Sequence, residues 1–143
     1  MHNLSANTAR GTKGVSEHIF TSGNTDGMAK SLEYAKKDFE GLCFINLVDF
    51  DMLYGHRQDA LGYANAINEF DAFLNDFMPN MRDDDLLIIT ADHGCDPSDE
   101  STDHTREYIP FLMYKKDIDA KNLNTIDGFS FIAETVKDYL LNK

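Results

Sequence analysis

Basic residues are scarce in this chain of 143 residues, and so are cysteines and long apolar runs. Its 13 Lys and Arg face 25 Asp and Glu, which gives a formal net charge of -12. So acidic a chain has little with which to displace the counterions of a nucleic-acid backbone or to bind an anionic membrane surface. We therefore expect no nucleic acid and no membrane among its partners.

The longest apolar run, residues 42–48, is interrupted by Asn46 and is far shorter than the roughly 20 residues that a membrane-spanning helix needs. The N-terminus has no basic stretch followed by an apolar one, so we expect no signal peptide and a cytoplasmic location. Cysteine occurs twice, as Cys43 in the apolar run and Cys95 in a polar segment. Two cysteines in such different surroundings do not indicate a disulfide framework.

What the chain does contain indicates one globular domain of the α/β class. Apolar residues recur every three or four positions in three segments, which predicts helices over residues 25–39, 61–78 and 128–141. Nearly continuous runs of branched and aromatic residues predict strands over 42–50 and 85–90, covered on both faces as in a parallel sheet. A third predicted strand, residues 108–114, contains Pro110, which favours the edge of a sheet. The order of these elements favours a layered α/β domain over a bundle or a sandwich.

Residues 1–24 are rich in Asn, Ser, Thr and Gly and show no sustained hydrophobic period. This composition predicts a tail or a loop-rich segment before the first helix.

Histidines and carboxylates follow two of the predicted strands. Asp51 and His56 come after the first strand, Asp92 and His93 come directly after the second, and His104 lies in the loop that follows. In open α/β sheets, ligands bind at the carboxyl ends of the strands. Imidazole and carboxylate together are the ligand set of borderline to hard divalent cations such as Zn²⁺ or Mn²⁺. The sequence therefore predicts a metal site at this edge of the sheet.

The loop over residues 92–103 strengthens this prediction. It holds five carboxylates, whose mutual repulsion disfavours a tight loop unless a cation neutralises some of them: Asp92, Asp96, Asp99, Glu100 and Asp103. Simpler interpretations exist for each part, namely a solvated face for residues 96–100 and a capped turn for a single Asp-His pair. Three groups of histidine and carboxylate converge at strand ends or in the loop that follows, and this convergence favours a metal site. Because histidine binds metal in its neutral form, we expect metal affinity to fall below about pH 6.5.

Four short segments form a distinctive combination. They are Asn-Leu-Val-Asp-Phe-Asp (46–51), Leu-Tyr-Gly-His-Arg (53–57), Ile-Thr-Ala-Asp-His-Gly (89–94) and Thr-Asp-His-Thr-Arg-Glu-Tyr (102–108). Together they resemble the phosphopentomutase family of the alkaline phosphatase superfamily. The resemblance covers residues 14–143 and implies the C-terminal portion of a three-layer α/β/α alkaline-phosphatase-like core. It leaves residues 1–13 as a polar tail of foreign or divergent sequence.

The resemblance also implies an activity and a set of metal ligands. The family interconverts (deoxy)ribose 1-phosphate and (deoxy)ribose 5-phosphate, using two Mn²⁺ ions and a phosphorylated threonine. Carried over by motif, Asp51, His56 and His104 hold one ion, while Asp92 and His93 hold the second. The family's nucleophilic threonine, a further aspartate ligand and the sugar-binding cap have no counterpart in these residues. We therefore expect the isolated chain to bind metal without turning over a pentose phosphate, and to self-associate through an incomplete sheet.

Two alternatives stay open from the residues alone. Another superfamily member, such as a metal-dependent phosphatase or the cofactor-independent phosphoglycerate mutase, shares the Asp-His-Gly segment. Arg57 after His56 and the run over residues 105–107 favour the pentomutase. A non-catalytic metal-binding module, by contrast, keeps the ligands and lacks a nucleophile. Arg57 and Arg106 either orient carboxylates near the metal or form structural ion pairs.

Overall fold

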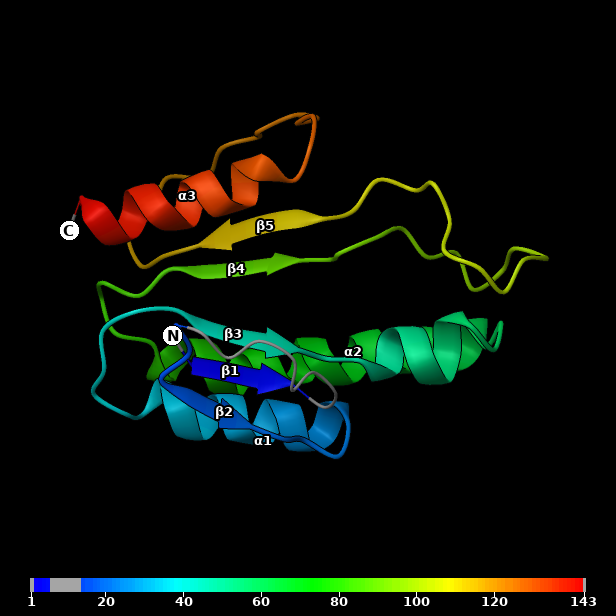
Figure 1. Ribbon diagram of the computed structural model, residues 1–143, viewed down its shortest axis with the longest axis horizontal. Helices are drawn as coiled ribbons and strands as arrows, with labels where there is room; N and C mark the ends of the chain where they lie inside the picture. The colour runs from blue at the N-terminus through cyan, green and yellow to red at the C-terminus, as the bar shows by residue number, and fades with distance from the viewer. Residues whose placement is uncertain (1, 6–13, 143) are drawn as a thin grey trace.

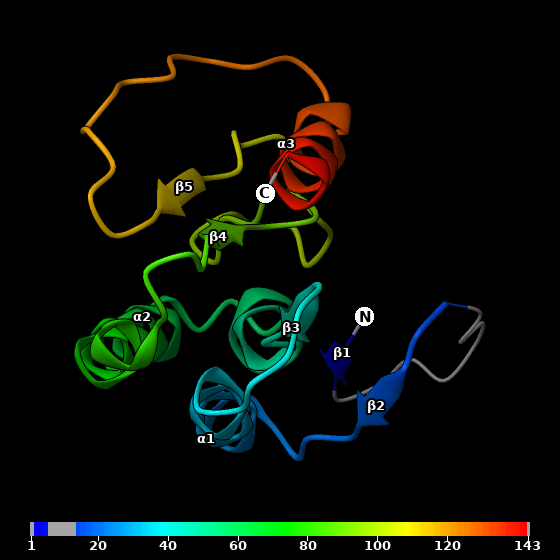
Figure 2. The ribbon, with the colours of Figure 1, turned by 90° about the vertical axis from the view of Figure 1, so that its left-hand side faces the viewer.

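The computed structural model describes residues 2–5 and 14–142, and its elements form three layers (Figures 1 and 2). The strands are β1 (His2–Ser5), β2 (Glu17–Ile19), β3 (Cys43–Asn46), β4 (Leu87–Thr90) and β5 (Phe111–Tyr114). The helices are α1 (Asn24–Ala35), α2 (Ala60–Phe77) and α3 (Ser130–Leu141), with a π-helical turn η1 (Phe50–Gly55) and a 3-10 turn η2 (Met78–Asn80). Figure 2 shows α1 and α2 on one side of the strands and α3 on the other. The predicted α/β class is confirmed.

The strands form two hydrogen-bonded groups. β1 lies between β2 and β3 and is parallel to both, with Asn3 opposite His18 and Phe44. β4 and β5 pair antiparallel, with Thr90 opposite Phe111. In both ribbon views β4 lies beside β3, and in Figure 1 it runs in the same direction, yet the described residues place the two strands in separate sheets. The parallel pairing expected for the two predicted strands is thus confirmed for β3, whereas β4 pairs antiparallel with β5.

Part of the predicted loop-rich segment is strand. Residues 2–5 form β1 and residues 17–19 form β2, so the interpretation of residues 1–24 as a tail or loops is wrong for both stretches. Strands this short carry no measurable period, and their pairing with neighbours decides their conformation. The remainder of the predicted polar tail, residue 1 and residues 6–13, lies outside the described residues.

The predicted strand over 42–50 is too long. β3 ends at Asn46, and Asp49 already has helical backbone angles of φ -68° and ψ -27°. The end of the apolar run serves another purpose, because the ring of Phe50 packs edge-on against Tyr63 of α2 with centroids 5.6 Å apart. Cover on both faces is also wrong for β3, since Phe44 is 51% exposed. An apolar run indicates burial without indicating where a strand stops.

The helices begin and end close to where their apolar spacing predicts, although the buried faces differ in detail. Met28 and Tyr34 of α1 are buried, and α2 turns the small Ala66 inward while Ile67 stays half-exposed. β5 begins directly after Pro110, in agreement with the lack of an N–H on proline. Among the described residues, none of the helices has the length and apolar composition needed to cross a membrane.

Candidate metal centre

Asp51 lies in the π-helical turn η1, and this turn brings His56 to it. The backbone N–H of His56 donates to the carbonyl oxygen of Asp51 at 2.9 Å, which is the five-residue bond of a π-helix. In an α-helix, side chains five positions apart point about 140° away from each other. Here His56 Nε2 lies 3.3 Å from Asp51 Oδ2. The wider turn therefore places both predicted ligands on one side of the backbone.

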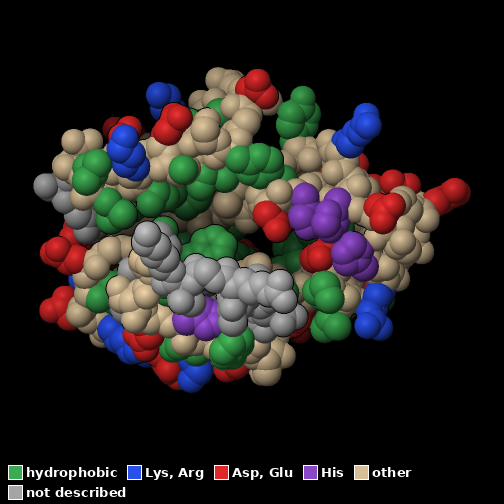
Figure 3. All heavy atoms as spheres, in the orientation of Figure 1, with side chains coloured by type: hydrophobic (Ala, Val, Ile, Leu, Met, Phe, Trp, Pro, Cys, Tyr) green, Lys and Arg blue, Asp and Glu red, His purple; other side chains and the backbone are tan. Residues whose placement is uncertain are grey.

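His93 and His104 both reach the same carboxylate from the loop after β4. An isolated antiparallel bridge joins Gly94 to Thr105, with the Thr105 N–H donating to the Gly94 carbonyl at 3.1 Å. The bridge aligns the neighbouring histidines, whose rings stack at 3.5 Å with an angle of 14° between their planes. Their Nε2 atoms lie 3.9 Å (His93) and 3.8 Å (His104) from Asp51 Oδ1. Figure 3 shows a group of histidine side chains beside acidic ones on one face of the molecule.

The main chain orients two of the imidazole rings. His56 Nδ1 hydrogen-bonds the Thr102 carbonyl, and His93 Nδ1 lies 3.0 Å from the Gly94 carbonyl. A carbonyl only accepts, so the proton of each neutral ring is on Nδ1 and the lone pair of Nε2 faces the Asp51 carboxylate. Ligating histidines are usually held in this way through their second nitrogen.

The surroundings of Asp51 Oδ1 test whether this site suits a cation. The atom is shielded from solvent, and no donor among the described residues reaches it. The two Nε2 atoms lie beyond hydrogen-bond range at 3.8 to 3.9 Å, and that of His93 carries no proton in the neutral tautomer described above. A buried carboxylate oxygen without a donor is costly, whereas a cation between these atoms satisfies all three. Ligand atoms of Asp51, His93 and His104 lie within 4.8 Å of one another, so the residues present fit a divalent metal.

Asp92 stands at the rim of this cluster. Its Oδ1 lies 3.5 Å from His93 Nε2, and its side chain is 86% exposed. His93 thus neighbours both Asp51 and Asp92, and the five predicted ligands form one continuous cluster rather than two separate groups. Their assignment to two ions stays a prediction.

Two of the other acidic residues of the loop have local partners. Asp96 Oδ1 accepts the backbone N–H of Ser98 at 2.8 Å, and Asp99 Oδ1 accepts that of Glu100 at 2.7 Å. These two carboxylates shape turns, so the solvated-face interpretation fits them better than metal ligation. Arg57 is exposed, and its Nε donates to the Met52 carbonyl at 3.4 Å rather than to a carboxylate.

Sequence reasoning missed the parts that hold the cluster together. The π-turn, the Thr102 carbonyl and the Gly94 bridge are backbone features, and only the glycine of Asp-His-Gly gave a signal. Cys95 was also missed: a Cβ on Gly55 would stand 2.6 Å from its Sγ, so Gly55 makes room for the thiol beside η1. Burial and the nearby Asp51 charge raise the pKa of the Cys95 thiol.

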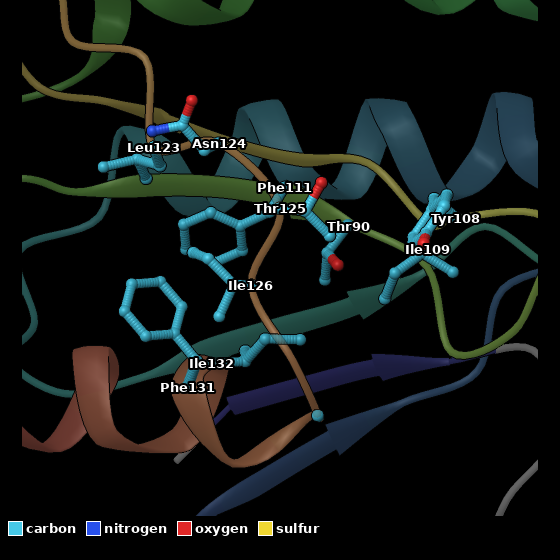
Figure 4. A pocket seen from close by; sticks show the side chains of 11 residues that line it. Thr90, Tyr108, Ile109, Phe111, Leu123, Asn124, Thr125, Ile126, Phe131 and Ile132 are labelled. Atoms are coloured by element: carbon cyan, nitrogen blue, oxygen red, sulfur yellow. The ribbon is translucent and has the colours of Figure 1, made fainter.

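Two open pockets lie next to each other beyond His93. The one that reaches the cluster has a volume of about 380 Å³ and is lined by Asp92, His93 and Thr105 on one side and by residues 126–129 on the other. The second, of about 220 Å³, is mostly apolar and lies between β5 and α3 (Figure 4). Four residues border both pockets, namely Tyr108, Ile109, Ile126 and Gly128. Only the first pocket adjoins the candidate ligands.

Comparison with known proteins identifies the family of the chain. The family model described as "Metalloenzyme superfamily" matches residues 2–143. The chain belongs to the metalloenzyme superfamily. The alkaline-phosphatase-like α/β core that the sequence implied agrees with this membership, and the match reaches into the segment predicted as a foreign tail.

Curated relatives of this metalloenzyme chain carry a more specific name. This chain is 55% identical over 131 residues to "Phosphopentomutase" of Acetivibrio thermocellus, and the match covers 91% of this chain and 34% of the relative. It is 57% identical over 129 residues to "Phosphopentomutase" of Clostridium acetobutylicum, covering 90% and 33%. The resemblance noted from four segments is confirmed over nine-tenths of the sequence. The chain spans about a third of the length of these relatives.

Proposed function

We propose that this chain is the metal-binding portion of a phosphopentomutase, with a pentose phosphate as substrate and Mn²⁺ as the bound ion. The observation that carries the proposal is the shielded Asp51 Oδ1, which faces two imidazole Nε2 atoms and no hydrogen-bond donor of the described residues. Identity above 50% to proteins of that name supports the choice of enzyme.

The proposed ligand assignment follows the family resemblance: Asp51, His56 and His104 hold one ion, while Asp92 and His93 hold the second. Asp51 Oδ1 lies almost as close to His93 Nε2 (3.9 Å) as to His104 Nε2 (3.8 Å), so His93 borders both proposed positions. When bound, two such cations neutralise phosphoryl charge and stabilise the attacking and leaving oxygens of an in-line displacement. The chain itself orients the ligand atoms, because main-chain carbonyls hold the rings of His56 and His93 through Nδ1.

The pocket beside the cluster suits the organic part of such a substrate. It offers about 380 Å³ next to His93 and carries the carboxylates of Asp92, Glu107 and Asp127, which accept hydrogen bonds from sugar hydroxyls. Its aromatic Phe129 is 56% exposed and supplies an apolar surface. A cytoplasmic location completes the proposal, because the free thiols Cys43 and Cys95 suit a reducing compartment.

Metal binding is tested by titrating the chain with Mn²⁺ and following free ion by electron paramagnetic resonance. We expect tight binding by the native chain and a loss of at least about tenfold in affinity for Asp51→Asn and His104→Ala. Asp99→Asn, which alters an acidic side chain of the same loop that caps a turn, is the matched control and should bind normally. Equal affinity of all four proteins would contradict the site.

The activity is tested in a chimera. The matched residues of this chain replace their counterparts in the Acetivibrio thermocellus phosphopentomutase, and the product is assayed for conversion of ribose 1-phosphate to ribose 5-phosphate. We expect turnover that Asp51→Asn abolishes in the same chimera. A folded chimera that binds Mn²⁺ without turnover would instead favour a non-catalytic metal-binding module.

A further inference from the structure

Asn24 and Asp49 form a reciprocal pair across 25 residues of sequence. Asp49 Oδ2 accepts the backbone N–H of Asn24 at 2.6 Å, and Asn24 Oδ1 accepts the backbone N–H of Asp49 at 3.0 Å. Each residue therefore contributes one main-chain donor and one side-chain acceptor. Asn24, the first residue of α1, is buried at 7% exposure. The pair joins the start of α1 to the residue immediately before η1.

The local sequence is built for this contact. The residue at the N-cap of α1 is Gly23, so the helix has no side-chain cap of its own, and the Asp49 carboxylate occupies that place. A Cβ on Gly23 would stand 2.7 Å from Asp49 Oδ2, and its φ of 150° lies in the region that favours glycine. A carboxylate at a helix N-terminus is stabilised by the unpaired N–H groups and the helix dipole there.

Asp49 is two residues from the centre of the metal cluster. The pair holds both its backbone and its side chain, and η1 begins at the next residue. A π-helical turn is less favourable than an α-helical one, so it needs support from its surroundings. At its far end, Asp59 supplies that support: its N–H donates to the Tyr54 carbonyl at 2.9 Å and its side chain caps α2. The contact of Asn24 with Asp49 supports η1 at its start.

We propose that the Asn24–Asp49 pair is a positioning device that anchors η1 to α1 and so aims Asp51 at His93 and His104. Asp49 takes part through hydrogen bonds to another segment of the chain, whereas the ligand is Asp51. The effect that this inference expects on metal binding rests on the proposed metal site. Its structural content, the anchoring of the π-turn, holds with or without an ion.

The test compares Asp49→Ala with Asp49→Asn in the full chain. The first removes the acceptor for the Asn24 N–H, whereas the second keeps an oxygen at the same place. In the metal-free chain, we measure amide hydrogen exchange at His56, whose N–H closes the π-turn onto Asp51. We expect Asp49→Ala to speed exchange at His56 while the amides of α2 keep their protection. Mn²⁺ affinity should fall by about ten- to a hundredfold in Asp49→Ala and stay within about threefold in Asp49→Asn.

Met81→Ala separates positioning from general destabilisation. Met81 is buried at 5% exposure and contributes no ligand, so its truncation weakens the fold without touching the pair. We expect it to leave both His56 exchange relative to α2 and Mn²⁺ affinity unchanged. The inference is overturned if hydrogen exchange at His56 in Asp49→Ala is as slow as in the native chain. It is also overturned if Asp49→Ala and Met81→Ala change His56 exchange and Mn²⁺ affinity equally. If the native chain itself binds no Mn²⁺, the proposed metal site fails, and the exchange measurement still decides on the pair.

Discussion

Single residues decide whether the three histidines meet. Gly94 sits in the bridge to Thr105, where a Cβ would stand 2.6 Å from the Glu107 carbonyl oxygen and 2.8 Å from the Thr105 carbonyl oxygen. Both neighbours are main-chain atoms, so neither can swing away as a flexible side chain does. The stacking of His93 on His104 therefore depends on the absence of a side chain at residue 94.

Gly94→Ala should thus open the bridge and lower Mn²⁺ affinity by at least about tenfold, a loss typical of disturbed support around a metal ligand. Gly41→Ala is the control for backbone strain alone, because Gly41 has a φ of 133° and a Cβ there would meet nothing within 4 Å. Titrations followed by electron paramagnetic resonance measure both. Normal affinity in Gly94→Ala would show that the bridge does not position the histidines.

Cys43 offers a prediction of reactivity that does not involve the metal. Burial, with the negative charge of Glu17, raises the pKa of its thiol to about 11. The thiolate is the reactive form and appears only as the pH rises toward that value. Iodoacetamide at pH 8 should therefore modify Cys43 slowly in the folded chain and rapidly in urea, as measured by mass spectrometry. Equal rates in the two states would contradict the burial.

At the scale of elements, the connection from η1 to α2 joins the metal cluster to the helical layer. Asp59 Oδ1 accepts the Gly62 N–H at 2.9 Å and caps α2, while the Asp59 N–H closes η1 onto Tyr54. Phe50 of η1 packs against Phe70 as well as Tyr63 of α2. The helix and the turn are therefore expected to support each other.

Asp59→Ala should lower the free energy of unfolding by about 1 kcal/mol, the usual cost of a lost helix cap. Asp59→Asn keeps an acceptor, so it should lower the free energy of unfolding by only a few tenths of a kcal/mol. Urea unfolding followed by circular dichroism measures the change. A midpoint unchanged in Asp59→Ala would mean that solvent replaces the cap at no cost.

For the whole molecule, a bound ion links stability to the proposed site. A ligand that binds only the folded chain stabilises it by about 2.7 kcal/mol at a hundred times its Kd. We expect Mn²⁺ to raise the unfolding temperature and EDTA to reverse the shift. His104→Ala is the control that should show a smaller shift than the native chain, and a Mn²⁺ effect equal to that of the native chain would place the ion elsewhere.

The strands leave edges that favour association between copies of the chain. β3 and β4 are not hydrogen-bonded to each other in the described part, and Leu112 of β5 is 59% exposed. Unpaired edges are templates for pairing with another chain. Sedimentation velocity should show association that strengthens with concentration and with salt, which screens the net charge of -12. A single monomeric species at high concentration and high salt would contradict this expectation.

Much of the fold was predictable from local pattern. The apolar spacing of α1, α2 and α3 predicted their existence and their approximate ends, because one face of each helix must be buried. The strands at residues 2–5 and 17–19 were not predictable, since their pairing depends on residues far along the chain. The end of β3 at Asn46 was likewise hidden inside an apolar run, where Phe50 turns toward α2.

The sequence by itself determined which donors are present and the family to which they belong. Imidazoles and carboxylates after predicted strands specify the chemistry of a divalent cation, because ligand type is a property of the side chain. Tertiary structure alone decided that Asp51 is the shared centre of the cluster. Its neighbours are set by a π-turn, a two-residue bridge and the proposed anchor of Asn24 on Asp49. Each of these hydrogen bonds has a main-chain N–H as its donor, and the bridge and the anchor join segments that come together only once the layers have packed.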